Sequence, residues 1–321
     1  MTGESEVLVV SDNKEIFETL YNAYKPLLFS LAYRMLGSVM DAEDVVHESF
    51  LALRKSGMDH VENVRAYLCK ISTNRCLDLL QSSAKKRELY PGPWLPEPLV
   101  GEACRTAEAA DPLQSYVDKE SLGTAYLLLL QQLSYVERAV FLLREALQFD
   151  YDEIADIVGK SSVNCRQIYH RAKSSLGNRL TFDGGTVATA DRELPDRPAA
   201  SGQEARLVER FVHALANADV GELMNVLSTD AALLMDGGGK VVALPRPIWG
   251  SRRISAFLAT LPAKLPSEAI VHLAEINGRL GAVVQAGEQT IAVLSFHMEN
   301  GRIAEIYVVV NPEKLRHVPK L

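Results

Sequence analysis

The residues with the clearest chemical potential lie between Tyr151 and Leu176, in the stretch YDEIADIVGKSSVNCRQIYHRAKSSL. Its second half places polar and basic side chains on one helical face: Val163, Arg166, Gln167, His170 and Arg171. Guanidinium groups neutralise phosphates, and guanidinium, amide and imidazole groups can bond base edges in a major groove. The pattern therefore indicates contact with duplex DNA.

Two helices must position these side chains. Ile154, Ala155 and Val158 mark the inner face of the first helix, and Gly159 ends it where a tight turn is needed. Ser161 can cap the second helix. Its apolar stripe consists of Cys165, Ile168, Tyr169, Ala172 and Leu176. The spacing predicts a helix-turn-helix. The alternative is an amphipathic helical pair whose basic residues are only solvated surface.

Composition limits the class of protein. The 321 residues predict two or three domains, and the net charge of −7 does not by itself indicate nucleic-acid binding. With no basic leader and no long apolar run, we expect a cytoplasmic protein without a membrane partner. The four cysteines, Cys69, Cys76, Cys104 and Cys165, form no CxxC pair. No metal and no cofactor are expected.

The N-terminal third has helical periodicity. Apolar and aromatic residues from Asn13 to Leu36 predict two helices, the second ended by Gly37. Asp41 to Lys55 predicts a third helix with an acidic edge formed by Asp41, Glu43, Asp44 and Glu48. Such an edge is either a solvated surface or a docking site for a basic protein partner.

Val64 to Leu80 predicts a fourth, basic helix. Between Asn63 and Arg87 there are six Lys or Arg residues and one acid, Asp78. Lys70, Asn74 and Arg75 lie on this helix with Tyr67. A basic surface with amides and an aromatic ring can follow phosphates and hold unstacked bases. The signal is weak on its own.

The order of these elements resembles bacterial sigma factors of the extracytoplasmic-function (ECF) type. DAEDVVHESF is similar to their polymerase-docking helix, RAYLCKISTNRCLDLL to their minus-ten helix, and residues 133–176 to their minus-thirty-five domain. The resemblance implies two partners, promoter DNA and core RNA polymerase, contacted at its clamp coiled coil and flap.

The resemblance also implies roles for individual residues. Asp41, Asp44 and Glu48 would help dock polymerase. Lys70, Asn74 and Arg75 would engage the opened minus-ten element, beside a base pocket lined by residues 58–62. The minus-thirty-five element would be read or clamped by Val163, Arg166, Gln167, His170 and Arg171.

Residues Glu88 to Pro112 form a proline-rich linker. It contains the motif WLPEPL, whose first three residues, Trp94, Leu95 and Pro96, are the regulatory candidates in the linker. An exposed tryptophan is costly in water, so we expect Trp94 to enter a pocket; packing on its own chain is the alternative. WLPEPL resembles the linker signature of one sigma subgroup that carries an additional C-terminal domain.

The C-terminal third predicts an α+β domain. Residues 181–202 read as a flexible linker, and helices are expected at 204–215, 220–227 and 252–261. Short strands are expected at 231–235 and 240–244, followed by a curved antiparallel sheet of about four long strands. The pattern resembles the SnoaL-like branch of the NTF2-like fold, a cone with a pocket between helices and sheet. Such a pocket could hold an unknown small ligand, and the sequence leaves open whether it does.

Two motifs extend the resemblance. The first is DGGGK: Asp236, Gly237, Gly238, Gly239 and Lys240. The second is NPEKL, in which Asn311, Pro312, Lys314 and Leu315 are the regulatory candidates. A hairpin turn explains the glycines without function, and phosphate binding is rejected because no strand-to-helix context follows. The resemblance implies that this domain regulates in cis through an intramolecular contact with the linker.

Catalysis is not expected. Asp230, Asp236, His272 and His297 are candidates by residue type, but His297 lies in an apolar strand and reads as structural. No catalytic residue is assigned, because fold analogy alone does not establish chemistry.

The resulting prediction is a multidomain protein with two all-α sigma domains and a C-terminal α+β, SnoaL-like cone. Its expected segments are 13–87, the linker 88–112, 113–180, the flexible linker 181–202, and 203–321. Its function would be promoter-specific initiation with cis regulation. Two alternatives stay open: a helix-turn-helix regulator that senses a small ligand, and a SnoaL-like enzyme with a DNA-binding appendage.

Overall fold

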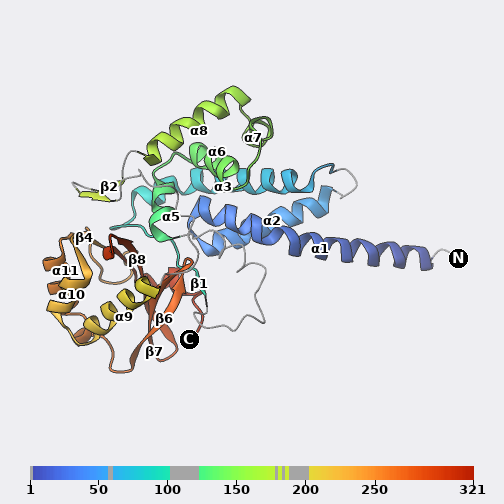
Figure 1. The fold of residues 1–321 in the computed structure, drawn as a ribbon. Helices are drawn as coiled ribbons and strands as arrows, with labels where there is room; N and C mark the ends of the chain where they lie inside the picture. Colours follow the sequence, from blue (N-terminus) through green and yellow to red (C-terminus); the bar gives the residue numbers. More distant parts are fainter. Residues whose placement is uncertain (1–2, 57–60, 102–122, 178–179, 183–184, 188–201) are drawn as a thin grey trace.

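The computed structural model describes residues 3–56, 61–101, 123–177, 180–182, 185–187 and 202–321. They form an N-terminal helical unit, a helix-turn-helix unit and a C-terminal unit, which we name by these terms throughout (Figure 1). The linker between the two helical units also contacts the C-terminal unit.

The N-terminal helical unit contains α1 (Gly3–Leu36), α2 (Val39–Ser56) and α3 (Val64–Glu88). The prediction of two helices between residues 13 and 36 is wrong, because α1 continues through Pro26. A proline inside a helix removes one main-chain hydrogen bond. Every residue from 26 to 36 is buried, and this tertiary packing stabilises the helix across the proline.

The helix-turn-helix unit contains α5 (Thr124–Gln131), α6 (Tyr135–Glu145), α7 (Tyr151–Val158) and α8 (Ser162–Gly177). Asp150 and Glu153 form a capping box at the start of α7. Gly159 ends α7 with φ of 67°, a left-handed conformation that glycine adopts without a Cβ penalty. The predicted cap is present, since the amide of Asn164 donates to Ser161 Oγ at 3.3 Å.

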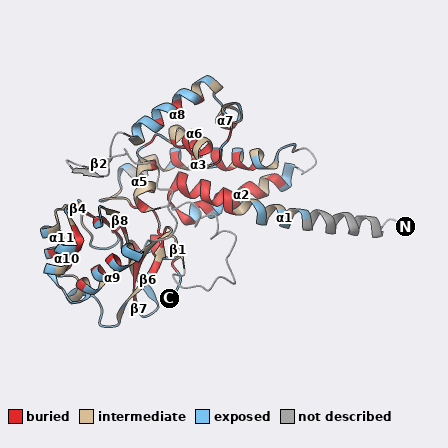
Figure 2. Ribbon diagram, in the orientation of Figure 1, coloured by how far each residue is buried: buried red, intermediate tan, exposed pale blue. Residues whose placement is uncertain are grey.

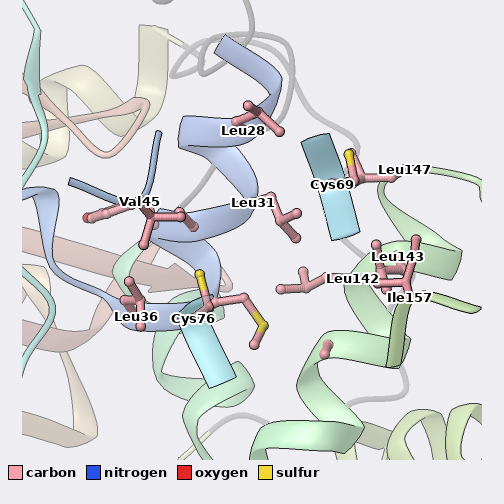
Figure 3. Packing of buried hydrophobic residues seen from close by; sticks show 14 of the residues in the cluster. Leu28, Leu31, Leu36, Val45, Cys69, Cys76, Leu142, Leu143, Leu147 and Ile157 are labelled. Atoms are coloured by element: carbon pink, nitrogen blue, oxygen red, sulfur yellow. The ribbon is translucent and has the colours of Figure 1, made fainter. Parts of the chain in front are cut away.

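The two helical units share one hydrophobic core. Figure 3 shows Leu28 and Leu31 of α1 and Cys69 and Cys76 of α3 facing side chains of α6 and α7. Those side chains are Leu142, Leu143 and Ile157, with Leu147 close by. The described cysteines Cys69, Cys76 and Cys165 are buried, as predicted, and Cys104 lies outside the described residues.

The C-terminal unit packs α9 (Gly202–Ala216), α10 (Val220–Val226) and α11 (Ser251–Leu258) on a curved sheet. Its strand order is β1-β6-β7-β8-β9-β4-β5. The strands are β1 (Val100–Gly101), β4 (Leu227–Asp236), β5 (Ile248–Trp249), β6 (Ala269–Ile276), β7 (Arg279–Ala286), β8 (Gln289–Glu299) and β9 (Arg302–Val309). The four long strands β6 to β9 are antiparallel, as predicted.

Three details of this unit differ from the predictions. β4 is parallel to β9, so the sheet is mixed. Residues 240–244 form no strand, because Gly238 and Gly239 turn the chain with φ of 59° and 68° and β5 starts only at Ile248. The linker itself supplies β1, which pairs with the end of β6.

Part of the segment predicted as a flexible linker is ordered. β2 (Leu180–Phe182) and β3 (Gly185–Val187) pair as a two-stranded antiparallel ribbon. Residues 188–201 of that segment lie outside the described residues.

The two faces of the large sheet have different coverings. One face packs on α9 to α11 through a core that includes Phe211, Leu223, Ile254 and Phe296. The other face packs on Leu95 of the linker and Leu128 of α5, with Leu315 of the short helix η3 (Pro312–Leu315). The sheet therefore joins the linker and the helix-turn-helix unit to the C-terminal unit.

Candidate functional site

The outer face of α8 presents all five side chains predicted to contact DNA. Val163, Arg166, Gln167, His170 and Arg171 are exposed, while Cys165, Ile168, Tyr169 and Ala172 of the apolar stripe are buried and Leu176 is half-buried. Figure 2 shows exposed residues along α8. Tyr169 anchors that stripe, and its hydroxyl donates to the carboxylate of Glu145 in α6. α6 and α7 pack on the buried side of α8 and leave its other face exposed to solvent.

On α3 the candidate side chains also point outward. Lys70, Asn74 and Arg75 are exposed, whereas Cys69 and Cys76 are buried on the opposite face. Burial raises the pKa of the Cys69 thiol to about 12, so this thiol stays protonated at neutral pH. The two cysteines therefore serve packing. The side chains of residues 85–87 and the loop residues 57–60 lie outside the described residues.

The acidic edge of α2 is only partly available to a partner. Asp41 and Asp44 are exposed, but Glu48 pairs with Arg75 of α3, whose Nη2 donates to Glu48 Oε1 at 2.8 Å. This hydrogen bond lowers the pKa of the Glu48 carboxyl. Two residues predicted to bind different partners, polymerase and DNA, are thus bonded to each other.

The DGGGK motif meets the linker at Asp236, whose carboxylate is completely buried. It accepts hydrogen bonds from the Tyr90 hydroxyl at 2.6 Å and from the amide of Leu95 at 2.8 Å. The ammonium group of Lys314 lies 2.8 Å from the same carboxylate and also donates to the carbonyl of Leu95. The ion pair therefore encloses the main chain of the linker.

Two of the three glycines, Gly238 and Gly239, allow a close approach that side chains would block. A Cβ on Gly238 would lie 2.2 Å from Asn311 Nδ2, and one on Gly239 would lie 2.7 Å from the Pro91 ring. Asn311 in turn donates to the Tyr90 hydroxyl at 3.0 Å. Lys240 pairs with exposed Glu313 at 3.2 Å.

NPEKL forms η3, which begins with Pro312 after the Asn311 cap. Lys314 and Leu315 are buried, and Leu315 shares a hydrophobic cluster with Leu95. His317, just beyond the motif, lies 2.8 Å from the carbonyl of Pro98. DGGGK and NPEKL therefore form one surface against the linker.

The linker is bonded to the N-terminal helical unit as well. The Trp94 ring lies against Gly37, where an added Cβ would be 2.7 Å from the ring, and Lys314 lies 3.8 Å from the ring centroid. The carboxylate of Glu97 accepts from the amide of Val39 at 2.7 Å at the start of α2. Leu95 and Pro96 are buried. WLPEPL thus lies between the N-terminal helical unit and the C-terminal unit.

Asn277 joins the units at a point that sequence reasoning missed. Its side-chain oxygen lies 3.0 Å from the Tyr33 hydroxyl of α1 and accepts from the amide of Leu99 at 2.9 Å. Its amide group donates to Thr124 Oγ1 at the start of α5. In the sequence the Asn-Gly pair signals only a hairpin turn, and nothing local identifies the three partners.

Two arginines also hold the helical units together. Arg138 of α6 is 1% exposed, and it donates to the carbonyl of Leu130 and to the carbonyl of Met35 in α1. Arg65 of α3 donates to the carbonyl of Leu147 and stacks on Phe149 at 4.7 Å. From its basic charge alone, the sequence analysis grouped Arg65 with the residues of α3 that can follow phosphates.

The candidates for catalysis are dispersed. Asp236 faces the linker, Asp230 is exposed and accepts from Ser228, and His297 lies 3.7 Å from Glu299. Glu305 of β9 was not anticipated: burial raises the pKa of this carboxyl to about 8. Among the described residues no group of three or more His, Cys, Asp or Glu side chains is arranged to hold a metal ion.

The described helices include none that is long and apolar enough to cross a membrane.

Comparison with known families identifies the two helical units. The sigma-70 region 2 model matches residues 20–86, and the sigma-70 region 4 model matches residues 124–176. The two helical units are thus the domains of a sigma factor, a protein that directs transcription initiation, and a C-terminal α+β domain follows them.

Particular relatives extend the similarity over most of the chain. ECF RNA polymerase sigma factor SigJ of Mycobacterium tuberculosis is 28% identical over 309 residues, covering 93% of each chain. Probable sigma factor SigI of the same species is 27% identical, covering 92% of this chain and 93% of its own. The crystal structure of SigJ superimposes with a TM-score of 0.70 at 26% identity, covering 92% of this chain and 97% of its own.

Proposed function

We propose that this sigma factor binds core RNA polymerase, reads a two-part promoter, and is regulated in cis by its C-terminal unit. The observation that carries the regulatory part is the buried Asp236–Lys314 pair around the main chain of Leu95. A buried ion pair is maintained only while its hydrogen bonds are satisfied. Movement of the linker would remove the Leu95 amide from Asp236 and the Leu95 carbonyl from Lys314.

The DNA-binding part rests on exposure and residue type. Lys70, Asn74 and Arg75 of α3 would engage the opened minus-ten element, where amides and basic groups can hold unstacked bases. The exposed face of α8 would read the minus-thirty-five element as duplex. Asp41 and Asp44 would dock the polymerase clamp coiled coil, with cytoplasmic localisation following from that partner.

The regulatory part follows from where the linker is bonded. Between Tyr90 and Gly101 it contacts α1, α2 and the C-terminal sheet, and Asn277 adds α5 to the same junction. Beside the hydrophobic core that the two helical units share, these contacts are a second route by which the C-terminal unit would influence the separation and orientation of α3 and α8. Two promoter elements read by one chain require a defined separation between the two reading helices.

In vitro transcription with core polymerase over a library of random promoters tests the proposal. The full chain should yield promoter-dependent transcripts, and Trp94→Ala and Asp236→Ala should change their amount. Lys240→Met is the matched control: Lys240 lies in the same motif as Asp236, and its ion pair is with exposed Glu313. Absence of transcripts would overturn the polymerase-dependent function; unchanged transcripts in both linker variants would overturn regulation through the linker.

A further inference from the structure

A cavity of about 180 Å³ lies at the boundary of the two helical units. Residues of α1, of α3 and of the end of α6 with the following turn line it. They are Leu27, Ser30, Leu31 and Arg34, then Arg65, then Leu142, Ala146, Leu147 and Gln148. No family motif or relative described above assigns it a ligand.

The lining combines positive charge with an apolar wall. It includes Arg34 and Arg65 and no acidic residue. Arg34 is 5% exposed, so its charge is held inside the protein, where electrostatic interactions are stronger than in water. Arg65 uses part of its fork on the carbonyl of Leu147, and a guanidinium has five donors. Leucines from both units supply the apolar part.

Gln148, at one side of the cavity, has an uncommon backbone conformation. Its φ is 56°, in the left-handed region that non-glycine residues seldom occupy. Strained residues of this kind concentrate at binding sites, where the surrounding structure maintains them. Gln148 and the buried residue Ser30 are the uncharged polar residues of the lining.

We propose that this cavity binds a small monocarboxylate with a compact apolar body about the size of one aromatic ring. An apolar cavity of about 150 Å³ is large enough to hold benzene, so about 180 Å³ accommodates a ring and a carboxylate. The arginines select an anion, because guanidinium and carboxylate geometries match. The leucines select a ligand with an apolar body over acetate or phosphate.

Occupancy of this site controls the relative position of the helical units; this step rests on the proposed function. The ligand contacts both units, and the Arg65–Leu147 and Arg138–Met35 bonds cross the same boundary. A ligand that binds one arrangement shifts the population toward it. The bound anion therefore stabilises the arrangement seen in the structure, in which the two helical units pack together, and opposes any separation of α3 from α6 and α7.

Calorimetric titration of the full chain with sodium benzoate tests the site without polymerase or promoter. Benzoate should bind, while benzyl alcohol and acetate should bind at least about tenfold more weakly, as expected when a charge-assisted bond or an apolar contact is missing. Arg65→Gln should weaken benzoate binding by a similar factor. Ala146→Leu fills the cavity and should abolish binding. Absence of benzoate binding, or equal binding by Ala146→Leu, overturns the site.

Hydrogen exchange of the full chain tests the coupling. Benzoate should slow amide exchange in residues 64–68 of α3 and in residues 142–148 together, because they lie on opposite sides of the boundary. Slower exchange on one side only would overturn the coupling, and unchanged exchange would do the same. Since neither experiment involves transcription, their failure is distinguishable from failure of the proposed function.

Discussion

The carboxylate of Asp236 and the ammonium of Lys314 lie 2.8 Å apart, with side chains 0% and 8% exposed. Both groups also bond the main chain of Leu95, one at its amide and the other at its carbonyl. The linker is therefore recognised through its backbone, and the neighbouring Trp94 ring packs over the lysine at 3.8 Å. Such a contact depends on the position of the linker main chain.

Breaking this pair should be costly. Lys314→Met leaves the Asp236 charge buried without its cation, and we expect a loss of about 3 kcal/mol or more in the free energy of unfolding. Lys240→Met breaks only the exposed pair with Glu313 and should cost less than about 1 kcal/mol. Urea denaturation of both variants measures the difference. Equal losses in the free energy of unfolding would show that the buried pair stabilises the protein no more than the exposed pair does.

The second prediction concerns Asn277. Asn277→Ala removes its bonds to Leu99 and Thr124 and its contact with Tyr33, and should cost about 2 to 3 kcal/mol by urea denaturation. The control is Asn300→Ala, at an exposed hairpin position with similar φ (50° against 52°). Because both asparagines have the same left-handed backbone conformation, the difference between the two losses in the free energy of unfolding measures the contribution of the Asn277 side-chain bonds. A difference below about 0.5 kcal/mol would contradict its role.

The third prediction compares two left-handed glycines. Gly159→Ala has nothing within 4 Å of the new Cβ, so it should cost only the strain of about 1 to 2 kcal/mol. Gly37→Ala has the same strain and must also displace Trp94. We expect an additional loss of at least about 1 kcal/mol. In a Trp249→Phe background, Trp94 fluorescence should shift to the red for Gly37→Ala alone.

The fourth prediction is a pH dependence set by Glu305, whose pKa in the folded protein is raised from 4.5 to about 8. Between these values the unfolded chain loses the proton while the folded protein retains it. Stability therefore falls as pH rises through this window, by about 1.4 kcal/mol per unit for this group. Glu305→Gln should reduce the fall between pH 5 and pH 8 in thermal unfolding. An identical slope in the variant would contradict the assignment.

The fifth prediction separates base reading from phosphate contact on α8. If Gln167 reads a base, Gln167→Ala should lower affinity for the preferred minus-thirty-five duplex by about 1 to 3 kcal/mol and relax sequence preference. If Arg171 contacts phosphate, Arg171→Ala should weaken all sequences alike and reduce the salt slope by about one. Fluorescence anisotropy at several salt concentrations distinguishes the two. If Arg171→Ala relaxed sequence preference and Gln167→Ala weakened all sequences alike, Arg171 would read the base and Gln167 would contact phosphate.

Local periodicity predicted the helices well where one face of the helix packs on the core and the other is exposed to solvent. The helix-turn-helix is the clearest case, because Gly159 and Ser161 mark its turn within a few residues. Periodicity misjudged α1, where burial carries the helix through Pro26. It also misjudged residues 240–244, where apolar residues lie in a loop after the glycine turn.

The candidate site divides in the same way. The exposed faces of α3 and α8 could be identified in the sequence, because a helix shows its solvent face in its own spacing. The Glu48–Arg75 pair, the Arg65–Leu147 bond and the Asn277 junction join residues 27, 82 and up to 244 positions apart. No local pattern encodes such partners.

The sequence by itself determined the three units, the exposed faces of α3 and α8, and the two motifs that flank the linker contact. These follow from helical and strand periods, glycine turns and charge, which are properties of neighbouring residues. Only the tertiary structure decided that Asp236 and Lys314 enclose the linker main chain, that Asn277 joins three segments, and that two arginines border an interdomain cavity. Buried polar groups must find partners wherever the packed chain brings them, so their pairing is a property of the whole fold.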